Sequence, residues 1–577
     1  RVLDHEEGFF LQQLRILDAP VDLEERAWRE QMRKTLAALT LRGGSPSQES
    51  LRVLLRELHR QDPLPAALER ATQTLDLALN SLYGAPASDR SALPYVIGLE
   101  PDLLGEAMVY RALGQAGRDA PMLLERLLIG ATFDELRQCF VVLGNLTGRF
   151  SERIGPWLRD FLLTDLQRRA PAAFEAAKAL GKQSAELHLG DILAGMLVEH
   201  GAFDIAHVLY DLGIPEKTIS LARLCCWIVE TKLEALPQET NLRGERAYLL
   251  MQLGNCQSAS GQRAEALRSA QASVVLYREL AAEQVNAFRP ELAAGLINLG
   301  NRQEEVGDWA AARESTVEGV HRFRELVAER PDAFRPQLAA SLANLSGRQA
   351  SLANKKEAQA EAQEAVELYD SLFRKQPAKY QYLLAASLTV LGNRHLDFGA
   401  FAQALCAAQR AVDLFQELTD EQPDAFVPDL AVSLNNLGAI QDQSGDLEAS
   451  RRSMEAAVSL YRPLCAVLPQ LHLPNLARSL TTLADIEFRL GLRLQGLAAA
   501  VEAVERCKAW AVKQQDRARP VLARALRILG HLHAELGDFA MALQATDAAL
   551  ELDQELVGML PSVFRPDLAL SLSNRGY

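Results

Sequence analysis

The residues with the clearest capacity for specific chemistry are amides and guanidinium groups that recur at a fixed spacing. Asn298 and Arg302 are followed 46 positions later by Asn344 and Arg348. A carboxamide can pair with the backbone of an extended peptide, and a guanidinium fork can bind a carboxylate. The pattern indicates a surface that recognises a protein or peptide, although the same side chains could instead bridge neighbouring repeats or face water. The candidate contacts are Asn298, Arg302, Asn344, Arg348, Arg394 and Asn436.

Sequence patterns typical of catalysis are absent. The chain has no Gly-x-Ser-x-Gly, His-Glu-x-x-His or Gly-x-x-x-x-Gly-Lys-Ser/Thr segment, so no nucleophile elbow, zinc-protease helix or phosphate-binding loop is predicted. His531 and His533 stand two residues apart in a helical pattern, which points their side chains to different faces. We therefore expect no catalytic residue, no metal site and no cofactor in this chain.

The overall composition excludes several classes of partner. The 577 residues carry a net charge of −14, which gives no general attraction to nucleic acid or to an anionic membrane. No apolar run approaches the roughly 18 residues that a membrane span requires. Seven cysteines are scattered without a Cys-x-x-Cys pair, which is the usage of a reduced, cytoplasmic protein. We expect a cytoplasmic protein with neither a membrane nor a nucleic-acid partner.

The candidate contacts belong to a unit of 46 residues that repeats in register. Each copy contains an alanine- and leucine-rich segment of about four turns, a glycine, a longer second segment and a Pro-Asp-Ala-Phe-type connector. Leucines at i, i+4 and i+7 of the first segment form an apolar stripe on a helix. Internal repetition at this period predicts a solenoid of helix pairs. The first leucine of the unit recurs at Leu292, Leu338, Leu384, Leu430, Leu476, Leu522 and Leu568.

Two kinds of residue mark the ends of the predicted helices. A glycine is expected to end the first helix in a left-handed conformation, and Ala353 stands in its place in one copy. A proline is expected at the start of the next first helix, where its missing N–H is not needed. The glycines are Gly261, Gly307, Gly399, Gly445, Gly491 and Gly537, and the prolines are Pro290, Pro336, Pro428, Pro474, Pro520 and Pro566.

The unit resembles the long form of the tetratricopeptide repeat, as found in kinesin light chains and many bacterial signalling proteins, over residues 242–577. The resemblance implies an all-α, right-handed superhelical solenoid of helix pairs, which we expect to be cut at its C-terminal end. It also implies that the first helices line a concave groove. On a helical wheel, Gly295, Asn298, Arg302 and Glu305 form the stripe that would face this groove and hold a protein or peptide ligand.

The part of the chain before the repeats divides into three segments. Residues 1–22 are interpreted as the end of a preceding module, 23–110 as a winged-helix-like domain, and 111–241 as an irregular helical connector with degenerate repeats. Three helical patterns followed by a short β-like segment are the outline of a winged helix. These patterns lie at 23–41, from Leu51 onward, at 68–82 and at 95–99.

A second resemblance concerns this N-terminal part. His5-Glu6, the three helical patterns and the segment at 99–106 (Leu-Glu-Pro-Asp-Leu-Leu-Gly-Glu) resemble the region that follows the nucleotide-binding module in signal-transducing ATPases with numerous domains, the STAND ATPases. The resemblance implies a winged helix between an ATPase and a repeat-built sensor. It implies ATP and Mg²⁺ only in a module outside this chain, triggered homo-oligomerisation, and a role in antiviral or stress defence. Two alternatives are the effector-sensing region of a MalT-like transcription regulator and a plain scaffold.

A basic stripe marks the second helical pattern of this domain. Arg52, Arg56 and Arg60 recur every four residues opposite the leucines. They are candidates for contact with the ATPase module or with DNA phosphates, and the alternative is a solvated helix face. The third pattern would enter a major groove, but it carries Glu69 and Asp76 and only one arginine, so DNA binding is not expected.

Overall fold

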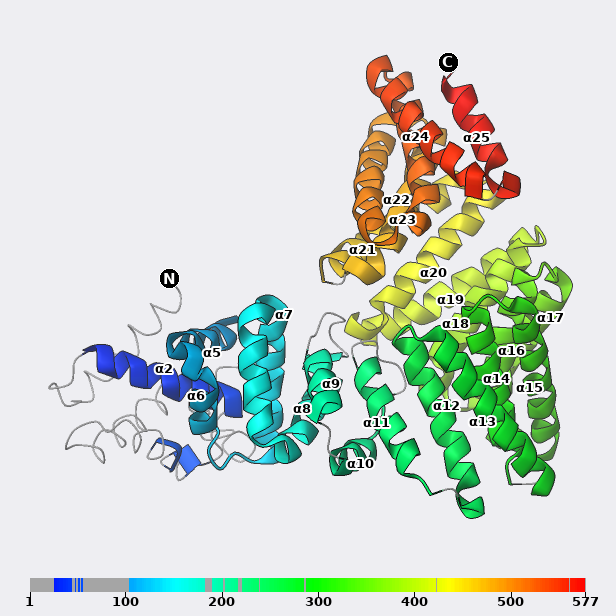
Figure 1. The fold of residues 1–577 in the computed structure, drawn as a ribbon. Coiled ribbons are helices and arrows are strands. Elements are labelled where there is room, and N and C mark those ends of the chain that lie inside the picture. Colours follow the sequence, from blue (N-terminus) through cyan, green and yellow to red (C-terminus); the bar gives the residue numbers. More distant parts are fainter. Residues whose placement is uncertain are drawn as a thin grey trace. The chain divides into compact units, whose positions relative to one another are not determined.

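The computed structural model is built from helices, and no strand occurs among the residues that it describes (Figure 1). It separates into two compact units, Arg1–Leu276 and Tyr277–Tyr577. The all-α class predicted from the repeat is confirmed. The described residues are 25–43, 47, 50–51, 53–55, 103–181, 189–200, 203–215, 221–237, 239–284, 287–421, 423–467, 469–559 and 561–575.

Several predictions for the N-terminal part fall outside the described residues. The basic stripe of Arg52, Arg56 and Arg60 lies there, as do the patterns at 68–82 and 95–99. The first helical pattern, expected at 23–41, is present as α2 (Glu25–Arg42). The winged-helix interpretation therefore stays a prediction.

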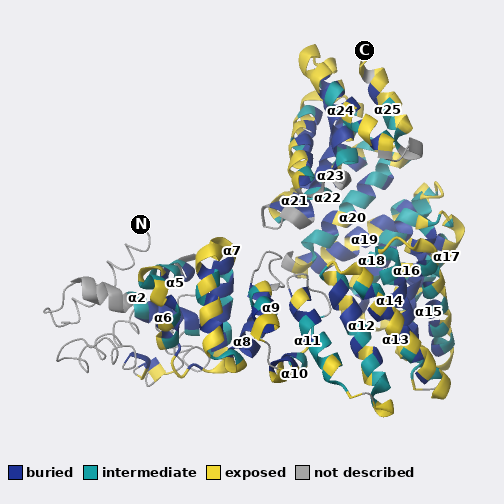
Figure 2. Ribbon diagram, in the orientation of Figure 1, coloured by how far each residue is buried: buried dark blue, intermediate teal, exposed yellow. Residues whose placement is uncertain are grey.

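The first unit is a cluster of helices whose buried residues (Figure 2) form one large hydrophobic core and a small second cluster on α11 and α12. The core extends from Leu36 on α2 to Cys256 on α12 and includes the fully buried rings of Phe140, Phe161 and Phe174. The helices of this unit after α2 are α5 (Leu103–Ala116), η1 (Gly117–Asp119), α6 (Ala120–Leu127), α7 (Phe133–Thr164), α8 (Leu166–Gly181), α9 (Leu189–His200), α10 (Phe203–Asp211), α11 (Ala222–Ala235), η2 (Thr240–Leu242) and α12 (Arg243–Ala259). Helix α5 spans the expected domain boundary between residues 110 and 111 and packs against α2.

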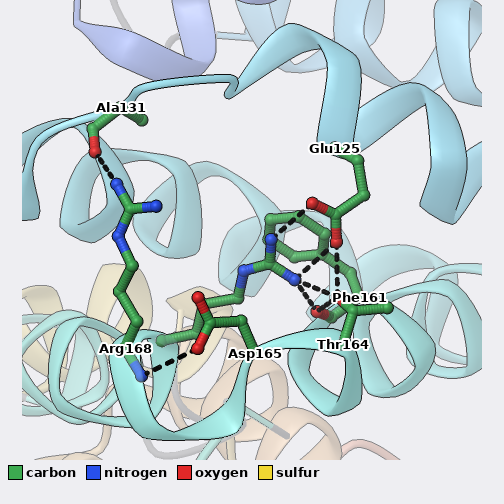
Figure 3. Close-up of polar contacts among 7 residues, drawn as sticks. Glu125, Ala131, Phe161, Thr164, Asp165 and Arg168 are labelled. Atoms are coloured by element: carbon green, nitrogen blue, oxygen red, sulfur yellow. Dashed lines mark hydrogen bonds and ion pairs between the residues drawn. The ribbon is translucent and has the colours of Figure 1, made fainter.

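A buried arginine joins α6, α7 and α8 (Figure 3). The guanidinium of Arg169 donates to both carboxylate oxygens of Glu125, at 2.6 Å each, and also to the backbone carbonyl of Phe161. It lies over the Phe161 ring, 3.9 Å from the ring centroid. Beside it, Arg168 donates to the carbonyl of Ala131. Because the buried charge is paired and hydrogen-bonded, its desolvation is offset, and the cluster ties the three helices together.

The second unit consists of helix pairs, each with a first and a second helix packed side by side (Figure 1). Helix α13 (Arg263–Glu283) contains the boundary between the units. Helix α23 (Arg493–Glu535) combines a second helix with the next first helix, and α25 (Pro561–Arg575) is the last. The other first helices are α14 (Arg289–Glu305), α16 (Pro331–Ser351), α18 (Pro377–Leu396), α20 (Pro423–Ser444) and α22 (Pro469–Arg489). The other second helices are α15 (Trp309–Glu329), α17 (Lys355–Lys375), α19 (Phe401–Glu421), α21 (Leu447–Val467) and α24 (Phe539–Met559).

The predicted left-handed turns between first and second helices are confirmed. All six glycines have positive φ, between 68° and 91°, and Ala353 has a φ of 60°. After α14 the N–H of Gly307 donates to Glu304 and that of Asp308 to Gln303, so the turn uses the last free carbonyls of the helix. Ala353 is the one residue other than glycine with positive φ in the described part of the chain.

The prediction for the prolines is correct at Pro290, which opens α14, and wrong at the other positions. Helix α16 begins at Pro331, five residues before Pro336, and the connector is its first turn. A proline at the first helical position followed by Asp332 favours a helix start, because the N–H is not needed there and the carboxylate meets the positive end of the helix dipole. The prolines inside helices are Pro336, Pro428, Pro474, Pro520 and Pro566.

Packing within the pairs follows the repeat. Leu292, Leu296 and Leu299 are buried on α14, as the apolar stripe predicts. Gly300 lies so close to α15 that a Cβ there would be 3.0 Å from the Ala312 carbonyl oxygen, which explains the small residue. The aromatic residues near the ends of the second helices, Tyr277, Phe323, Tyr369, Phe415 and Tyr461, are all buried. Among the described helices, none combines the length and the apolar character needed to cross a membrane.

Candidate recognition surface

Four consecutive first helices present one stripe of small and amide side chains. On α16 the exposed residues Ala340, Asn344 and Gly347 follow one another at intervals of four and three, which places them on one side of the helix. The same registers on α14, α18 and α20 are exposed or half-buried. We call this set the amide stripe. It consists of Ala294, Asn298 and Asn301 on α14, Ala340, Asn344 and Gly347 on α16, Ala386, Val390 and Asn393 on α18, and Val432, Asn436 and Ala439 on α20.

The predicted asparagines all lie on this stripe. Asn344 is exposed, whereas Asn298 and Asn436 are half-buried. None of their side chains has a hydrogen-bond partner within the described part of the chain, and the same is true of Asn393. Their donors and acceptors are therefore open to water or to a ligand.

The predicted arginines lie beneath the stripe. The side chain of Arg348 is only 2% exposed, and its Nη2 atom reaches back to α14, 2.5 Å from Asn301 Oδ1 and 3.1 Å from Glu304 Oε2. Arg302 and Arg394 are half-buried and pair with acidic residues three positions further along the chain, Glu305 and Asp397, with N–O distances of 3.1 and 3.2 Å. Burial lowers the pKa of Arg302 and of Arg348. For Arg348 the observed role is a bridge between repeats, and a ligand-binding role of the arginines stays a prediction.

The register of these arginines is an interior position of the array. In the next three copies it is held by Ile440, Ile486 and Leu532, all fully or almost fully buried. A comparison of the copies in the sequence contains this signal, because a position that takes isoleucine or leucine in three copies is a core position.

Two asparagines of the stripe were not among the sequence candidates. Asn301 and Asn393 stand in the same register two repeats apart. The Oδ1 atom of Asn301 accepts a hydrogen bond from Arg348. The NH₂ group of Asn301 is then the part of the amide that can bond to a ligand. The regular spacing could have identified both residues.

The next register along the first helices is polar, and its members are buried or half-buried. Gln441 accepts a hydrogen bond from Ser453, 2.7 Å away on α21, and Gln349 accepts one from Arg313 at 3.0 Å. In the α22 copy this register holds Glu487, whose side chain has an oxygen without a hydrogen-bond partner. Burial, together with the charge of Glu455, raises the pKa of Glu487 to about 7. The polar side chains of this register therefore affect the stability of the helix pairs and are not part of the amide stripe.

The surface changes character beyond α20. The registers of Ala294 and Ala340 are held on α22 and on the second half of α23 by Arg478 and Arg524, both exposed. Arg524 pairs with Asp485 at 3.3 Å. The amide stripe therefore ends where exposed arginines replace the alanines of its first register.

No group of three or more His, Cys, Asp or Glu side chains that could hold a metal ion occurs among the described residues. Six of the seven cysteines are buried as free thiols, and Cys406 is exposed.

Comparisons with known proteins address the fold. The family model of the tetratricopeptide repeat matches residues 431–463, which run from α20 into α21. A search of curated proteins gave no match.

Three solved structures are similar in architecture. BtubC (BKLC) from P. vanneervenii is 16% identical with a TM-score of 0.34, and the match covers 43% of this chain and 90% of that one. A STAND protein with a tetratricopeptide repeat sensor from Pyrococcus horikoshii is 10% identical with a TM-score of 0.41, covering 89% and 69%. A Rap protein complexed with Competence and Sporulation Factor is 11% identical with a TM-score of 0.36, covering 71% and 99%. At these scores, the assignment of the second unit as a tetratricopeptide-type array rests on its own repeat and on the family match.

Proposed function

We propose that the amide stripe binds an extended polypeptide segment through the backbone of that segment. The observation that carries the proposal is the row of unpaired carboxamides on α14, α16, α18 and α20. A peptide backbone offers N–H and C=O groups at regular intervals, and an asparagine side chain can serve both. Asn298, Asn344 and Asn436 share one register, and Asn393 on α18 stands one turn further along its helix, so the amides follow the array from helix to helix.

The small residues of the stripe support a backbone contact. Ala294, Ala340, Gly347, Ala386 and Ala439 leave little side-chain bulk between the asparagines. A ligand can therefore approach the helices closely and place its own side chains over the alanines. The stripe itself holds no charged residue, so the proposed ligand is an uncharged or weakly charged segment.

We place this recognition surface in a larger signalling protein. The resemblance of the N-terminal sequence to STAND ATPases supports a role as the sensor arm of a cytoplasmic ATPase. In this proposal, ligand binding favours an ATPase state that oligomerises, and the ligand shifts the equilibrium by its differential affinity for the two states. Antiviral or stress defence is the process that the resemblance suggests. Catalysis and nucleotide binding would belong to a module outside this chain.

The binding proposal can be tested with peptides selected from a displayed random library against the 577-residue chain. Dissociation constants are then measured by fluorescence anisotropy for the wild type and for the variant Asn298→Ala/Asn344→Ala/Asn436→Ala. Each lost hydrogen bond should cost about 0.5–1.5 kcal/mol, so the triple variant should bind at least about tenfold more weakly.

A matched control removes three exposed amides from the second helices: Gln363→Ala/Gln409→Ala/Gln416→Ala. These glutamines bond only to carboxylates one turn ahead on their own helices. The control should bind as the wild type does. Equal loss in both variants, or no loss in either, refutes the assignment of the stripe.

The wider role needs the full-length protein. Deleting residues 242–577 should abolish triggered ATP hydrolysis and triggered oligomerisation, measured by phosphate release and by light scattering after chromatography. Triggered activity that survives the deletion would remove the sensor role.

A further inference from the structure

Ion pairs join consecutive second helices of the array at a constant spacing of 40 residues. We call them the second-helix ladder. Each ion pair links one second helix to the next second helix. In three of the pairs the arginine lies on the earlier helix, and in one pair it lies on the later helix. The rungs are Arg278–Glu318, Arg324–Glu364, Asp370–Arg410 and Arg462–Glu502. They connect α13 to α15, α15 to α17, α17 to α19, and α21 to α23.

The rung between α19 and α21 is missing. The register would place it at Gln416 and Ala456, which cannot form an ion pair. Gln416 instead donates to Asp420 on its own helix, at 2.7 Å. No hydrogen bond or ion pair joins the described side chains of α19 to those of α21.

The hydrophobic core divides at the same place. One cluster, with Leu437 and Ile440, ends on α20, and the next begins with Ala431 and Met454. The half-buried Leu434 on α20 and Leu460 on α21 each pack against both clusters. An earlier division lies between the clusters of α14–α17 and α16–α20, and there the rung Arg324–Glu364 spans it. The division at α20 has no such rung.

The packing within the α20–α21 pair, next to the junction, is also of a different kind. In the other pairs, the residue of the second helix that faces the glycine register of the first is alanine or threonine, such as Thr316 and Ala408. In this pair it is Met454, whose Cε atom would be 3.0 Å from a Cβ on Gly438. Methionine is flexible and polarizable, so it can fill a space that changes shape.

The first-helix side of the junction remains tied. Ser479 on α22 donates to Asn435 on α20 at 2.7 Å, and Arg489 donates to Asp442. A further interruption of the ladder at Lys508 and Ala548 lies within a single core cluster, so it does not coincide with a division of the core.

We infer that the array bends at the junction of α19 and α21, as a hinge between two rigid blocks, 289–421 and 447–535. The second helices open or close there while the first helices stay joined through α20 and α22. Because α20 carries the last part of the amide stripe, bending changes the angle between that stripe and the charged surface that follows. The hinge does not depend on the proposed peptide binding and stands on the contacts of the free chain.

The test uses three positions in one register, two repeats apart. Cys406 on α19 is the exposed natural cysteine, and Glu314 on α15 and Ala498 on α23 are exposed and lie 92 residues before and after it. Nitroxide labels at Cys406 and Glu314→Cys report on a block with complete rungs. Labels at Cys406 and Ala498→Cys report across the junction. Double electron–electron resonance then gives a distribution of label-to-label distances for each pair in the full 577-residue chain.

We expect the distribution across the junction to be broader than the one within the block. The variant Gln416→Arg/Ala456→Glu supplies the missing rung, and it should narrow the broad distribution toward the width seen within the block. An exposed ion pair changes such an equilibrium by up to about fivefold, which is enough to be visible as a loss of the outlying distances.

Two results would overturn the inference. Equal widths for the two label pairs would show that the junction is no more mobile than the block. A broad distribution that the added rung leaves unchanged would show that the missing rung does not determine the motion. Circular dichroism of each labelled chain confirms that the helices are intact.

Discussion

Replacing Glu487 by glutamine should stabilise the α22–α23 pair, and the gain should depend on pH. The side chain of Glu487 is 4% exposed, one of its carboxylate oxygens has no partner, and burial raises its pKa to about 7 from the ordinary value of 4.5. In the other copies this register is held by a neutral amide or by histidine, as with Gln349, Gln441 and His533. The ionised carboxylate is therefore a local source of instability.

The sign of the pH dependence follows from the raised pKa. Between pH 4.5 and about 7 the folded protein holds a proton on Glu487 that the unfolded chain releases. The free energy of unfolding from this group is therefore highest below pH 4.5 and falls as the pH rises to about 7. Each pH unit of the interval is worth about 1.4 kcal/mol, so the ionised group costs roughly 3 kcal/mol near pH 8. Glutamine resembles the protonated form, so Glu487→Gln should recover most of this near pH 8 and about 1 kcal/mol near pH 5.

Hydrogen exchange read by mass spectrometry measures the effect where it arises. Amides of α22 and α23 should exchange roughly a hundredfold more slowly in Glu487→Gln near pH 8, after correction for intrinsic rates, and only severalfold more slowly near pH 5. Glu505→Gln, at an exposed position of α23, is the matched control and should leave exchange unchanged. A gain of the same size at both pH values, or an equal gain in the control, would refute the reasoning.

Two further predictions concern single positions in the α14–α17 region. Ala353→Gly should stabilise the turn between α16 and α17 by about 1 kcal/mol, because glycine adopts the φ of 60° without the cost that alanine bears. Ala340→Gly, inside α16, should instead destabilise that helix by about 1 kcal/mol. Hydrogen exchange of the α16 and α17 amides measures both changes. Arg348→Ile should change the free energy of unfolding by less than about 1 kcal/mol, because other copies bury an aliphatic residue in this register. Glu304→Ala should lower the free energy of unfolding by about 1–3 kcal/mol, because it leaves the buried guanidinium of Arg348 without its carboxylate. Urea unfolding followed by circular dichroism separates the two, and a large loss in Arg348→Ile would show that the guanidinium is required.

The ends of the helices were predictable from the local sequence only in part. The left-handed turns were predictable at the glycines because only glycine adopts positive φ without strain. Ala353 was the exception in the sequence, and its positive φ was not predicted. The starts of the first helices were not predictable from proline alone. Four of the connectors offer two prolines five residues apart. Pro331 rather than Pro336 opens α16, because the residues between them can complete a first turn.

The candidate recognition surface was also predictable only in part. The spacing of Asn298, Asn344 and Asn436 was sufficient to place them on one solvent-facing stripe, since residues in equal registers of equal repeats share a face. The wheel of a single helix could not separate that stripe from the arginine register beside it. The neighbouring repeat makes the difference: α14 covers Arg348 and supplies Glu304 and Asn301 as its partners.

The sequence by itself determined the all-α class, the period of the solenoid, the turns and the line of asparagines, because each of these depends on residue type at a repeated position. Only the tertiary structure decided which polar residues are buried between repeats, where the core divides, and which junction lacks its ion pair. Those properties depend on contacts between helices about 40 residues apart, and such contacts are set by how the neighbouring helices pack.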